Sequence, residues 1–388
     1  MVGGHGEMED LVTNPNFWRG RRVFLTGHTG FKGAWMSLIL GSLRAQVEGL
    51  ALAPDDARNL FIVATAENDV VHRLGDICKL NVVREAMARA QPEIVIHMAA
   101  QSLVRRSYAE PVETYATNVM GTVHLLEAVR HTPSVKAALI VTSDKCYENA
   151  ERLSGYSETD TLGGRDPYSN SKGCAELVTN AYRRSFFDGE GSTPIASARA
   201  GNVIGGGDWS RDRLIPDAMQ AFKRRTPLHI RNPLAVRPWQ HVIDPLLAYL
   251  SLIERLVKDG AEFAEGWNFG PSPASEVRVG TIADELVRLW GKGACWMKAG
   301  DDHPHEAAYL RLDCTKAADR LGWTPRLPLD EGLRLTVEWY KAFERGANMR
   351  AVTLAQIDQL LQRDSTNSAL HEKGLILEPA VTAGGLLQ

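Results

Sequence analysis

Short apolar runs alternate with longer amphipathic segments along the first 200 residues of the chain. Apolar periodicity predicts strands at residues 22–26, 47–52, 94–98, 138–141 and 195–199, and helices at 33–45, 80–90, 114–130 and 168–187. Parallel strands need crossover connections, and helices usually provide them. The pattern therefore predicts an α/β fold with a parallel sheet that has helices on both faces.

Beyond about residue 202 the pattern changes, because Gly, Pro and Trp become frequent and the periodic segments become shorter. We predict a first domain at residues 17–201, completed by segments that return from the second half. Residues 202–345 mainly form a smaller C-terminal lobe over the carboxyl edge of the sheet. Residues 350–388 form a peripheral, partly mobile tail with one helix at 354–361.

Composition narrows the class of protein. The 388 residues are 44% hydrophobic and 23% charged, which is typical of a soluble globular protein. A net charge of -3 provides no basic field for nucleic acid. No secretory signal and no membrane-spanning apolar stretch are expected. The five cysteines form no C-x-x-C pair and the histidines lack metal-ligand spacing, so we predict no metal site and a cytoplasmic location.

A glycine-rich turn, "GHTGFKG", joins the first predicted strand to the first predicted helix. Glycines let backbone N–H groups approach a pyrophosphate at a helix N-terminus, where the helix dipole favours anions. An ordinary strand-to-helix turn is the alternative, but the position after the first strand favours a dinucleotide and a doubly wound sheet of the Rossmann type. The predicted cofactor residues here are Gly27, His28, Thr29, Gly30, Phe31, Lys32 and Gly33.

Further cofactor contacts are predicted at Asp76 and Ile77, at Ala99, Ala100 and Gln101, and at Asn118 and Thr142. With the G-x-x-G-x-x-G spacing, this pattern resembles the extended short-chain dehydrogenase/reductase family, which implies NAD or NADP. The second strand ends without a clear acid for the ribose hydroxyls. Because Lys32 is cationic and His28 can become so, NADP stays open beside NAD.

Tyr168 and Lys172 lie four residues apart in "DPYSNSKGCAE", on one face of a predicted helix. A neighbouring ammonium and a cationic nicotinamide favour phenolate, so we expect the tyrosine pKa to be lowered. The pair would then take a proton from an alcohol while hydride leaves to the cofactor. A surface pair is the alternative. Thr142 or Ser143, at the end of the preceding strand, would hold the substrate alcohol near the tyrosine.

Asp144 and Lys145 follow that strand in "VTSDKCY". A solvated salt pair is one explanation, but active sites of open α/β sheets lie at these strand ends. Sugar-nucleotide 4,6-dehydratases carry an Asp and a Glu there. With a Lys in place of Glu, and with "NVIGGGDW", "RLIPD" and "RPWQHV", residues 17–343 resemble the CDP-glucose 4,6-dehydratases.

The resemblance implies oxidation at C4 of CDP-glucose by a tightly held NAD, loss of water across C5 and C6, and return of hydride to C6. By analogy Asp144 is the acid and Lys145 the base, although which residue has which role stays open. A lysine base needs a lowered pKa. Successive residues of a strand face opposite sides of the sheet, so Asp144 and Lys145 can reach one substrate only where the strand pleat is interrupted.

The nucleotide-sugar site is predicted in the second half of the chain. Arginine forks suit phosphate oxygens, and an apolar segment at 214–216 suits a base; solvated surface arginines are the alternative. The resemblance places Arg237 and Asn268 on the diphosphate, and Tyr309 with Arg311 over the site. The predicted substrate residues are Ser143, Asn202, Arg213, Leu214, Ile215, Pro216, Arg231, Arg237, Asn268 and Tyr309.

Two other functions stay open: a dehydratase or epimerase for another nucleotide sugar, and a catalytically silent dinucleotide-binding protein. The adjacent acid and base, Asp144 and Lys145, disfavour both an epimerase and a protein that has lost catalysis. The base of the nucleotide does not follow from residue chemistry. The family also implies a homodimer or a dimer of dimers, formed through a bundle of the helices at 114–130 and 168–187.

Overall fold

The structure is a computed structural model that describes residues 13–54, 56–300 and 309–372, with side chains described to residue 362. Its centre is a seven-stranded parallel sheet in the order β10-β6-β5-β4-β1-β2-β3. The strands are β1 (Arg22–Thr26), β2 (Gln46–Ala51), β3 (Val70–Leu74), β4 (Ile94–His97), β5 (Ala137–Val141), β6 (Ile195–Ala200) and β10 (Gly266–Phe269). The predicted Rossmann-type α/β fold is confirmed.

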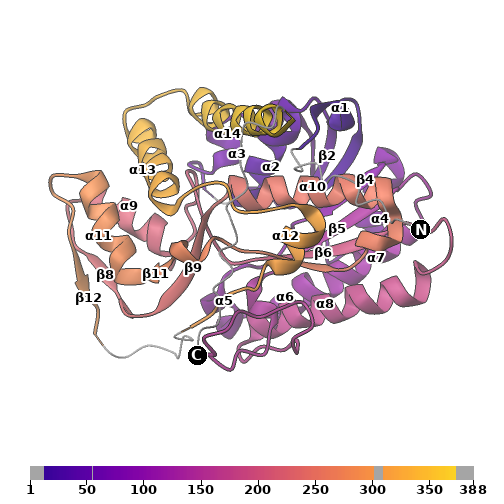
Figure 1. Ribbon diagram of the computed structural model, residues 1–388, viewed down its shortest axis with the longest axis horizontal. Coiled ribbons are helices and arrows are strands. Elements are labelled where there is room, and N and C mark those ends of the chain that lie inside the picture. The colour runs from indigo at the N-terminus through magenta and orange to yellow at the C-terminus, as the bar shows by residue number, and fades with distance from the viewer. Residues whose placement is uncertain (1–12, 55, 301–308, 373–388) are drawn as a thin grey trace, which may run out of the picture.

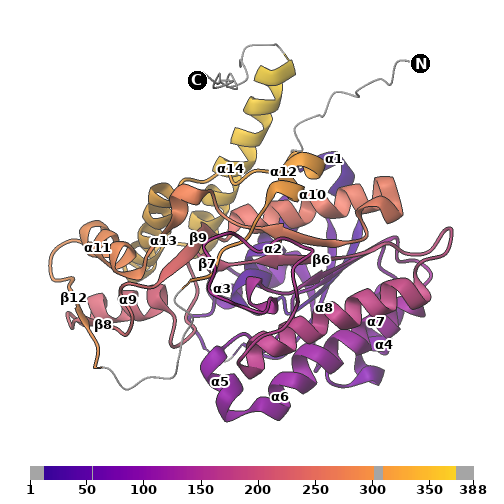
Figure 2. The same cartoon turned by 60° about the horizontal axis from the view of Figure 1, so that its bottom comes forward.

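Helices cover both faces of this sheet (Figure 2). On one face, α4 (Leu80–Ala90), α7 (Gly121–Arg130) and α8 (Pro167–Phe186) pack on the apolar side chains of the strands. The other face is covered by α2 (Phe31–Ser42) and α10 (Ile243–Asp259) within the largest hydrophobic core. Edge strand β3 was not predicted, because most of its residues are exposed and its apolar pattern is weak.

The helix predicted at 114–130 is interrupted. It consists of α6 (Pro111–Tyr115), a π-helical turn (Ala116–Met120) and α7. A π-turn inserts one extra residue and commonly occurs at functional sites. Here it carries Asn118, which is buried and turned towards the end of β4. The interruption therefore places a polar side chain beside the carboxyl edge of the sheet.

A smaller lobe lies beside the sheet, on the left in Figure 1. It contains a three-stranded sheet, β7 (Asn202–Ile204), β9 (Val236–His241) and β11 (Glu276–Arg278), and a parallel pair, β8 (Leu228–Ile230) with β12 (Trp296–Lys298). Its helices are α9 (Leu214–Lys223), α11 (Val279–Trp290) and α13 (Leu329–Glu344). The remaining helices are α1 (Pro15–Trp18), α3 (Leu60–Val63), α5 (Val104–Ala109), α12 (Thr315–Leu321) and α14 (Met349–Glu372).

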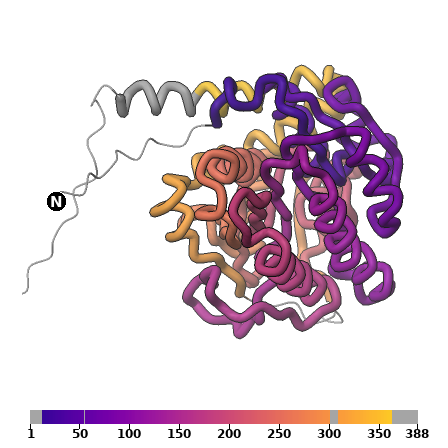
Figure 3. The backbone as a smooth tube through the Cα atoms, turned by 90° about the vertical axis from the view of Figure 1, so that its right-hand side faces the viewer, coloured from indigo at the N-terminus to yellow at the C-terminus, as the bar shows by residue number. Residues whose placement is uncertain are grey.

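The first turns of α14 are packed against the rest of the molecule. Ile357 is fully buried, and Trp339 of α13 donates a hydrogen bond to the hydroxyl of Thr353 at 2.9 Å. Arg350 forms an ion pair with Asp69 at 2.6 Å. The backbone of this helix runs beside the early part of the chain (Figure 3). Residues 373–388 of the predicted tail lie outside the described residues.

Candidate active site

One cleft of about 1160 Å³ lies between the carboxyl edge of the sheet and the smaller lobe. The predicted catalytic residues Ser143, Asp144, Lys145, Tyr168 and Lys172 all line it. Of the predicted substrate residues in the second half, it is also lined by Asn202, Arg213, Leu214, Ile215, Pro216, Arg231 and Arg237. Residues that are far apart in the chain therefore meet at one edge of the sheet.

The turn after β1 has the geometry that a dinucleotide needs. Gly27 has a positive φ of 75°, and a Cβ there would lie 2.7 Å from the backbone of Ala99. A Cβ on Gly33 would lie 2.1 Å from the carbonyl oxygen of Gly27. Only glycine fits such close approaches, and the turn leads into the N-terminus of α2, whose free N–H groups favour anions. The predicted cofactor turn therefore fits a pyrophosphate.

His28 and Lys32 of this turn are both held by other side chains. His28 is buried, and its Nε2 lies 2.6 Å from Nδ1 of His72. Burial, with repulsion from His72, lowers the pKa of His28 to about 4, so its ring is neutral near pH 7. Lys32 donates a hydrogen bond to the hydroxyl of Tyr249 at 3.0 Å, and burial lowers its pKa to about 7. His28 is therefore not the cation that a 2′-phosphate would need.

Asn118 was predicted to contact the cofactor, but its amide is already engaged inside the protein. It accepts a hydrogen bond from the N–H of Gln101 at 2.9 Å and donates to the carbonyl of Gln101 and the hydroxyl of Ser171, each at 2.9 Å. It does not line the cleft. Asn118 is therefore a positioning residue, which fixes the segment after β4 against the helix that carries Lys172.

The strand-end acid and lysine lie on a turn that breaks the pleat. Val141 ends β5, and Asp144–Cys146 form one turn of 3-10 helix with Ser143 as the N-cap. The Ser143 hydroxyl donates to the carboxyl of Asp144 at 2.9 Å and accepts from the N–H of Lys145 at 3.3 Å. The break brings Asp144 and Lys145 to the same cleft, as their predicted joint role requires.

Asp144 is almost fully buried, and burial raises the pKa of its carboxyl, while Lys145, Ser143 and Arg237 counteract that rise. A carboxyl that holds its proton more strongly is better suited to act as an acid. The direction of this shift agrees with the role predicted for Asp144.

Tyr168 and Lys172 lie on α8 with their side chains at the cleft, as predicted. The expected lowering of the tyrosine pKa is not produced by the protein's own groups. Burial raises the pKa of Tyr168 to about 12, against a lowering effect of its hydrogen bond with Ser143. Burial also lowers the pKa of Lys172 to about 8, which weakens the positive charge that was to favour phenolate.

Thr142 and Ser143 can now be distinguished. The hydroxyl of Thr142 donates to Oε1 of Glu176, whereas Ser143 is hydrogen-bonded with Tyr168. Ser143 is therefore the hydroxyl beside the catalytic phenol. Thr142 was also predicted to contact the cofactor; it lines the cleft, but its hydroxyl is directed to Glu176.

Glu176 is part of a buried network that the sequence did not reveal. Its carboxylate forms an ion pair with Arg199 at 2.7 Å and accepts from the hydroxyl of Ser197 at 2.7 Å. Both charged side chains are at most 5% exposed. The carboxylate stands one turn after Lys172 on α8 and partly offsets the effect of burial on the pKa of that lysine. A charged residue within an apolar strand, Arg199 in "IASARA", was the available signal.

We expect Glu176→Gln to reduce the free energy of unfolding by about 3–5 kcal/mol, because it leaves the buried guanidinium of Arg199 without a counter-charge. The measurement is chemical denaturation followed by circular dichroism. Glu113→Gln is the control, since Glu113 forms an exposed ion pair with Arg106, and such pairs contribute about 0–1 kcal/mol. Equal losses in the two variants would contradict the expectation.

Three residues predicted to close or line the substrate site lie elsewhere. Asn268 is fully buried; its amide accepts from the Tyr147 hydroxyl at 2.7 Å and donates to two backbone carbonyls, so it is not available to a diphosphate. Tyr309 pairs through its backbone with Val236 and does not line the cleft. Arg311 forms an ion pair with Glu276 at 2.7 Å. Leu310, between them, does reach the cleft.

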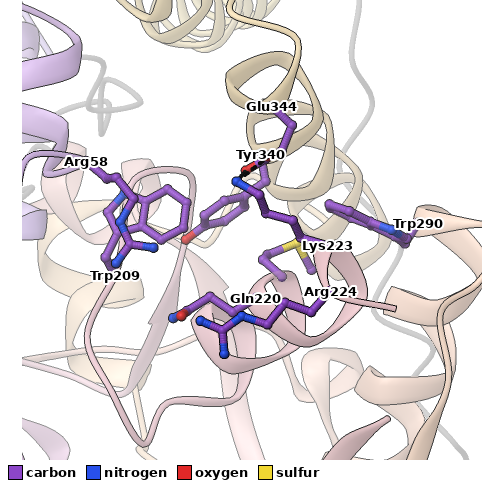
Figure 4. Close-up of a pocket in the computed structure, with 9 residues that line it drawn as sticks. Arg58, Trp209, Gln220, Lys223, Arg224, Trp290, Tyr340 and Glu344 are labelled. Atoms are coloured by element: carbon purple, nitrogen blue, oxygen red, sulfur yellow. Dashed lines mark hydrogen bonds and ion pairs between the residues drawn. The ribbon is translucent and has the colours of Figure 1, made fainter. Parts of the chain in front are cut away.

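The loop before α9 holds Arg213 at the cleft. Arg213 forms an ion pair with Asp208 at 3.1 Å, and the carbonyl of Asp208 accepts from the hydroxyl of Tyr340 at 2.5 Å. The next residue, Trp209, packs edge-on against the Tyr340 ring at 5.1 Å. These rings border a separate small cavity of about 120 Å³, shown in Figure 4. Helix α13 thus holds the loop that orients Arg213, a predicted substrate residue.

Within the described ranges, no group of three or more His, Cys, Asp or Glu side chains is arranged to hold a metal ion. In the same ranges, no helix combines the length and the apolar character that crossing a bilayer requires.

The fold and the site place the chain among the extended short-chain dehydrogenases/reductases, which move a hydride between a dinucleotide and an alcohol or ketone. Within this class the chain belongs to the family described as GDP-mannose 4,6 dehydratase, whose model matches residues 24–336. The family relationship predicted from the sequence, to the sugar-nucleotide 4,6-dehydratases, is thereby confirmed.

Known proteins agree with this assignment. The chain is 51% identical over 354 residues to the CDP-glucose 4,6-dehydratase of Salmonella typhimurium, covering 90% of this chain and 99% of that protein. The dTDP-glucose 4,6-dehydratase of Bacillus anthracis in complex with NAD is 23% identical, with a TM-score of 0.69, covering 85% and 100% of the two chains. The UDP-glucose 4-epimerase of Thermotoga maritima with UDP-glucose is 22% identical, with a TM-score of 0.71 over 83% and 99%. These two structures show the shared fold.

Proposed function

We propose that this protein converts CDP-D-glucose to CDP-4-dehydro-6-deoxy-D-glucose and water. The observation that carries the proposal is the 51% identity, over 90% of the chain, to a protein named as a CDP-glucose 4,6-dehydratase. The cleft supports it, because Tyr168, Ser143, Asp144 and Lys145 line one cavity, where an oxidation at C4 and an elimination at C5 and C6 can share one bound sugar.

The reaction is redox neutral, and each of its protons has a residue to carry it. The dinucleotide, when bound, accepts hydride from C4 and returns it at C6. Tyr168, hydrogen-bonded with Ser143, takes the proton of the C4 hydroxyl. The resulting ketone acidifies the C5 hydrogen, which Lys145 removes. Asp144 gives its proton to the C6 hydroxyl, which leaves as water, and the protonated Lys145 returns a proton to C5 when hydride reaches C6. Exchange with solvent then passes the proton gained by Tyr168 to Asp144, which restores both residues.

NAD is the cofactor we propose. The glycine turn fits a pyrophosphate, and the neutral His28 gives no support to a 2′-phosphate. The related Bacillus anthracis dehydratase is described in complex with NAD. Strands β1, β3 and β4 end at the same edge of the parallel sheet. The segments that follow these strands carry the predicted cofactor residues.

The homodimer and the cytoplasmic location stay predictions. The helices predicted to form the subunit contact expose apolar side chains, with Leu177 55% and Met120 47% exposed. Val112 of α6, just before the first predicted helix, is 81% exposed. These exposed side chains support a contact between copies through this part of the molecule.

The proposed function is tested by incubating the purified protein with CDP-, dTDP-, UDP- and GDP-glucose in deuterated water. We expect a 4-keto-6-deoxy product with deuterium at C5 from CDP-glucose, because the C5 proton is exchanged with solvent when it is removed and returned. Nuclear magnetic resonance of the product shows both changes.

The other outcomes identify the alternatives. Turnover of a different nucleotide sugar with deuterium at C5 would reject CDP-glucose as the substrate and keep the dehydratase chemistry. Inversion at C4 without loss of water would show an epimerase. No reaction with any of the four sugars, in protein that binds NAD, would contradict the proposed function.

A further inference from the structure

The proposed function leaves one question about the substrate open, which is what selects cytosine from the other pyrimidine bases. The order of groups in the cleft places the base. The sugar must reach Tyr168 and Ser143 at the end of β5, and the diphosphate needs the arginines of the lobe. The base would then lie further from the sheet, near the first turn of α9 and strand β8, whose residues line the same cleft.

Helix α9 leads from the phosphate region to that end. Arg213 at its N-cap lines the cleft together with Tyr168, and its guanidinium donates hydrogen bonds to Ser102 and Asp208. Asp217 follows one turn later, about 6 Å further along the axis. Its backbone N–H bonds to the carbonyl of Arg213 at 3.0 Å.

Apolar side chains of α9 and β8 line the cleft together with Asp217. Leu214 and Pro216 come from α9, Leu228 and Ile230 from β8, and all four line the same cavity as Asp217. Such walls suit the faces of a planar base but provide no hydrogen bonds to its edge. The carboxyl of Asp217 is a polar group of this wall that the proposed catalytic steps do not use.

The carboxyl of Asp217 is half-buried and retains acceptor capacity. Burial, with repulsion from Asp212, raises its pKa to about 6, and Arg231 and Arg105 oppose the rise. In the described part of the chain, it accepts a hydrogen bond from the backbone N–H of Asp212. A carboxylate has about four acceptor positions, so it can accept further hydrogen bonds from a ligand.

We propose that Asp217 determines specificity for the base by accepting a hydrogen bond from the 4-amino group of cytosine. Uracil and thymine carry a carbonyl oxygen at that position, which would face the carboxylate oxygen without a proton between them. A site that hydrogen-bonds an N–H of its substrate strongly rejects the analogue that lacks it, because the buried acceptor is left unpaired. This inference rests on the proposed function.

Two substitutions at Asp217 test the assignment. Asp217→Leu removes the acceptor, so we expect binding of CDP to weaken by about ten-fold to a hundred-fold and binding of UDP to change by less than about three-fold. Asp217→Asn keeps an acceptor oxygen and adds an N–H that can meet the uracil carbonyl. It should bind CDP nearly as well as the wild type does and bind UDP more tightly.

The measurements are dissociation constants for CDP and UDP by titration calorimetry, and kcat/KM for CDP-glucose and UDP-glucose. Asp212→Asn is the control, because it removes the same charge from the loop just before α9, where Asp212 pairs with Arg105 at 3.0 Å. The ratio of CDP to UDP binding should stay within about three-fold of the wild type in this control.

The results separate this inference from the proposed function. If the wild-type protein prefers CDP-glucose and the ratio of CDP to UDP binding is unchanged in both Asp217 variants, the role of Asp217 is overturned and the function stands. If the wild-type protein dehydrates UDP-glucose or dTDP-glucose in preference, the proposed substrate itself is wrong. A purely structural role would weaken CDP and UDP alike, and the Asn variant would not gain UDP binding.

Discussion

Tyr168→Phe is expected to reduce kcat for the nucleotide sugar by at least about 10²-fold to 10⁴-fold, the range typical for loss of a positioned proton acceptor. The phenol is buried at the cleft beside Ser143, and α8 holds it in place. Phenylalanine lacks the phenolic oxygen, so the variant has no group in that position to take the proton of the C4 hydroxyl. The ketone then does not form, and neither of the later steps begins.

The measurement is steady-state turnover together with NAD binding, which should be retained because the phenylalanine keeps the ring. Tyr115→Phe is a suitable control, since Tyr115 donates to Asn170 at 2.9 Å and does not line the cleft. A Tyr168→Phe enzyme as fast as the parent would refute the proposed oxidation at C4.

Asp144→Asn is expected to stop the reaction at a later point. The amide cannot protonate the C6 hydroxyl, so we expect turnover to fall by about 10²-fold to 10⁴-fold. Tyr168, Ser143 and Lys172 are unchanged, so oxidation at C4 should still proceed. In a single turnover the absorbance of the reduced nicotinamide should rise and persist, whereas the Tyr168→Phe enzyme should show no such rise.

The two variants thus separate the oxidation from the elimination. Deuterium exchange at C5 in the Asp144→Asn enzyme adds a second readout, because Lys145 can still remove that proton once the ketone is present. If the Asp144→Asn enzyme released dehydrated product at the parent rate, Asp144 would not be the acid. If it formed no reduced nicotinamide, the carboxyl would be needed for oxidation as well.

Sequence reasoning located the parts of the site that local geometry dictates. The turn at Gly27 and Gly33 could be predicted because backbone atoms approach where a Cβ would lie, and only glycine permits that approach. Tyr168 and Lys172 were predictable because four residues along a helix place two side chains on one face. A break in the pleat at Asp144 was also predicted, since Asp144 and Lys145 can reach the same substrate only if the strand ends there.

The parts that were missed depend on contacts between distant segments. Asn118 and Asn268 have the residue type of ligands, but their amides are engaged by backbone groups and side chains that fold next to them. Glu176 and Arg199 come from α8 and β6, and no local pattern shows that they form an ion pair. Asp217 is a candidate ligand because it lines the cleft, and the sequence "RLIPD" does not show that position.

Strand β10 joins the sheet beside β6, although 65 residues of chain, 201–265, separate the two strands. Strands β7, β8 and β9 and helix α9 all lie within that interval and outside the main sheet. The lobe residues of this interval therefore resemble an insertion between two neighbouring strands. Evolution can alter such an insertion, and with it the choice of nucleotide, while the edge that performs hydride transfer keeps both of its flanking strands.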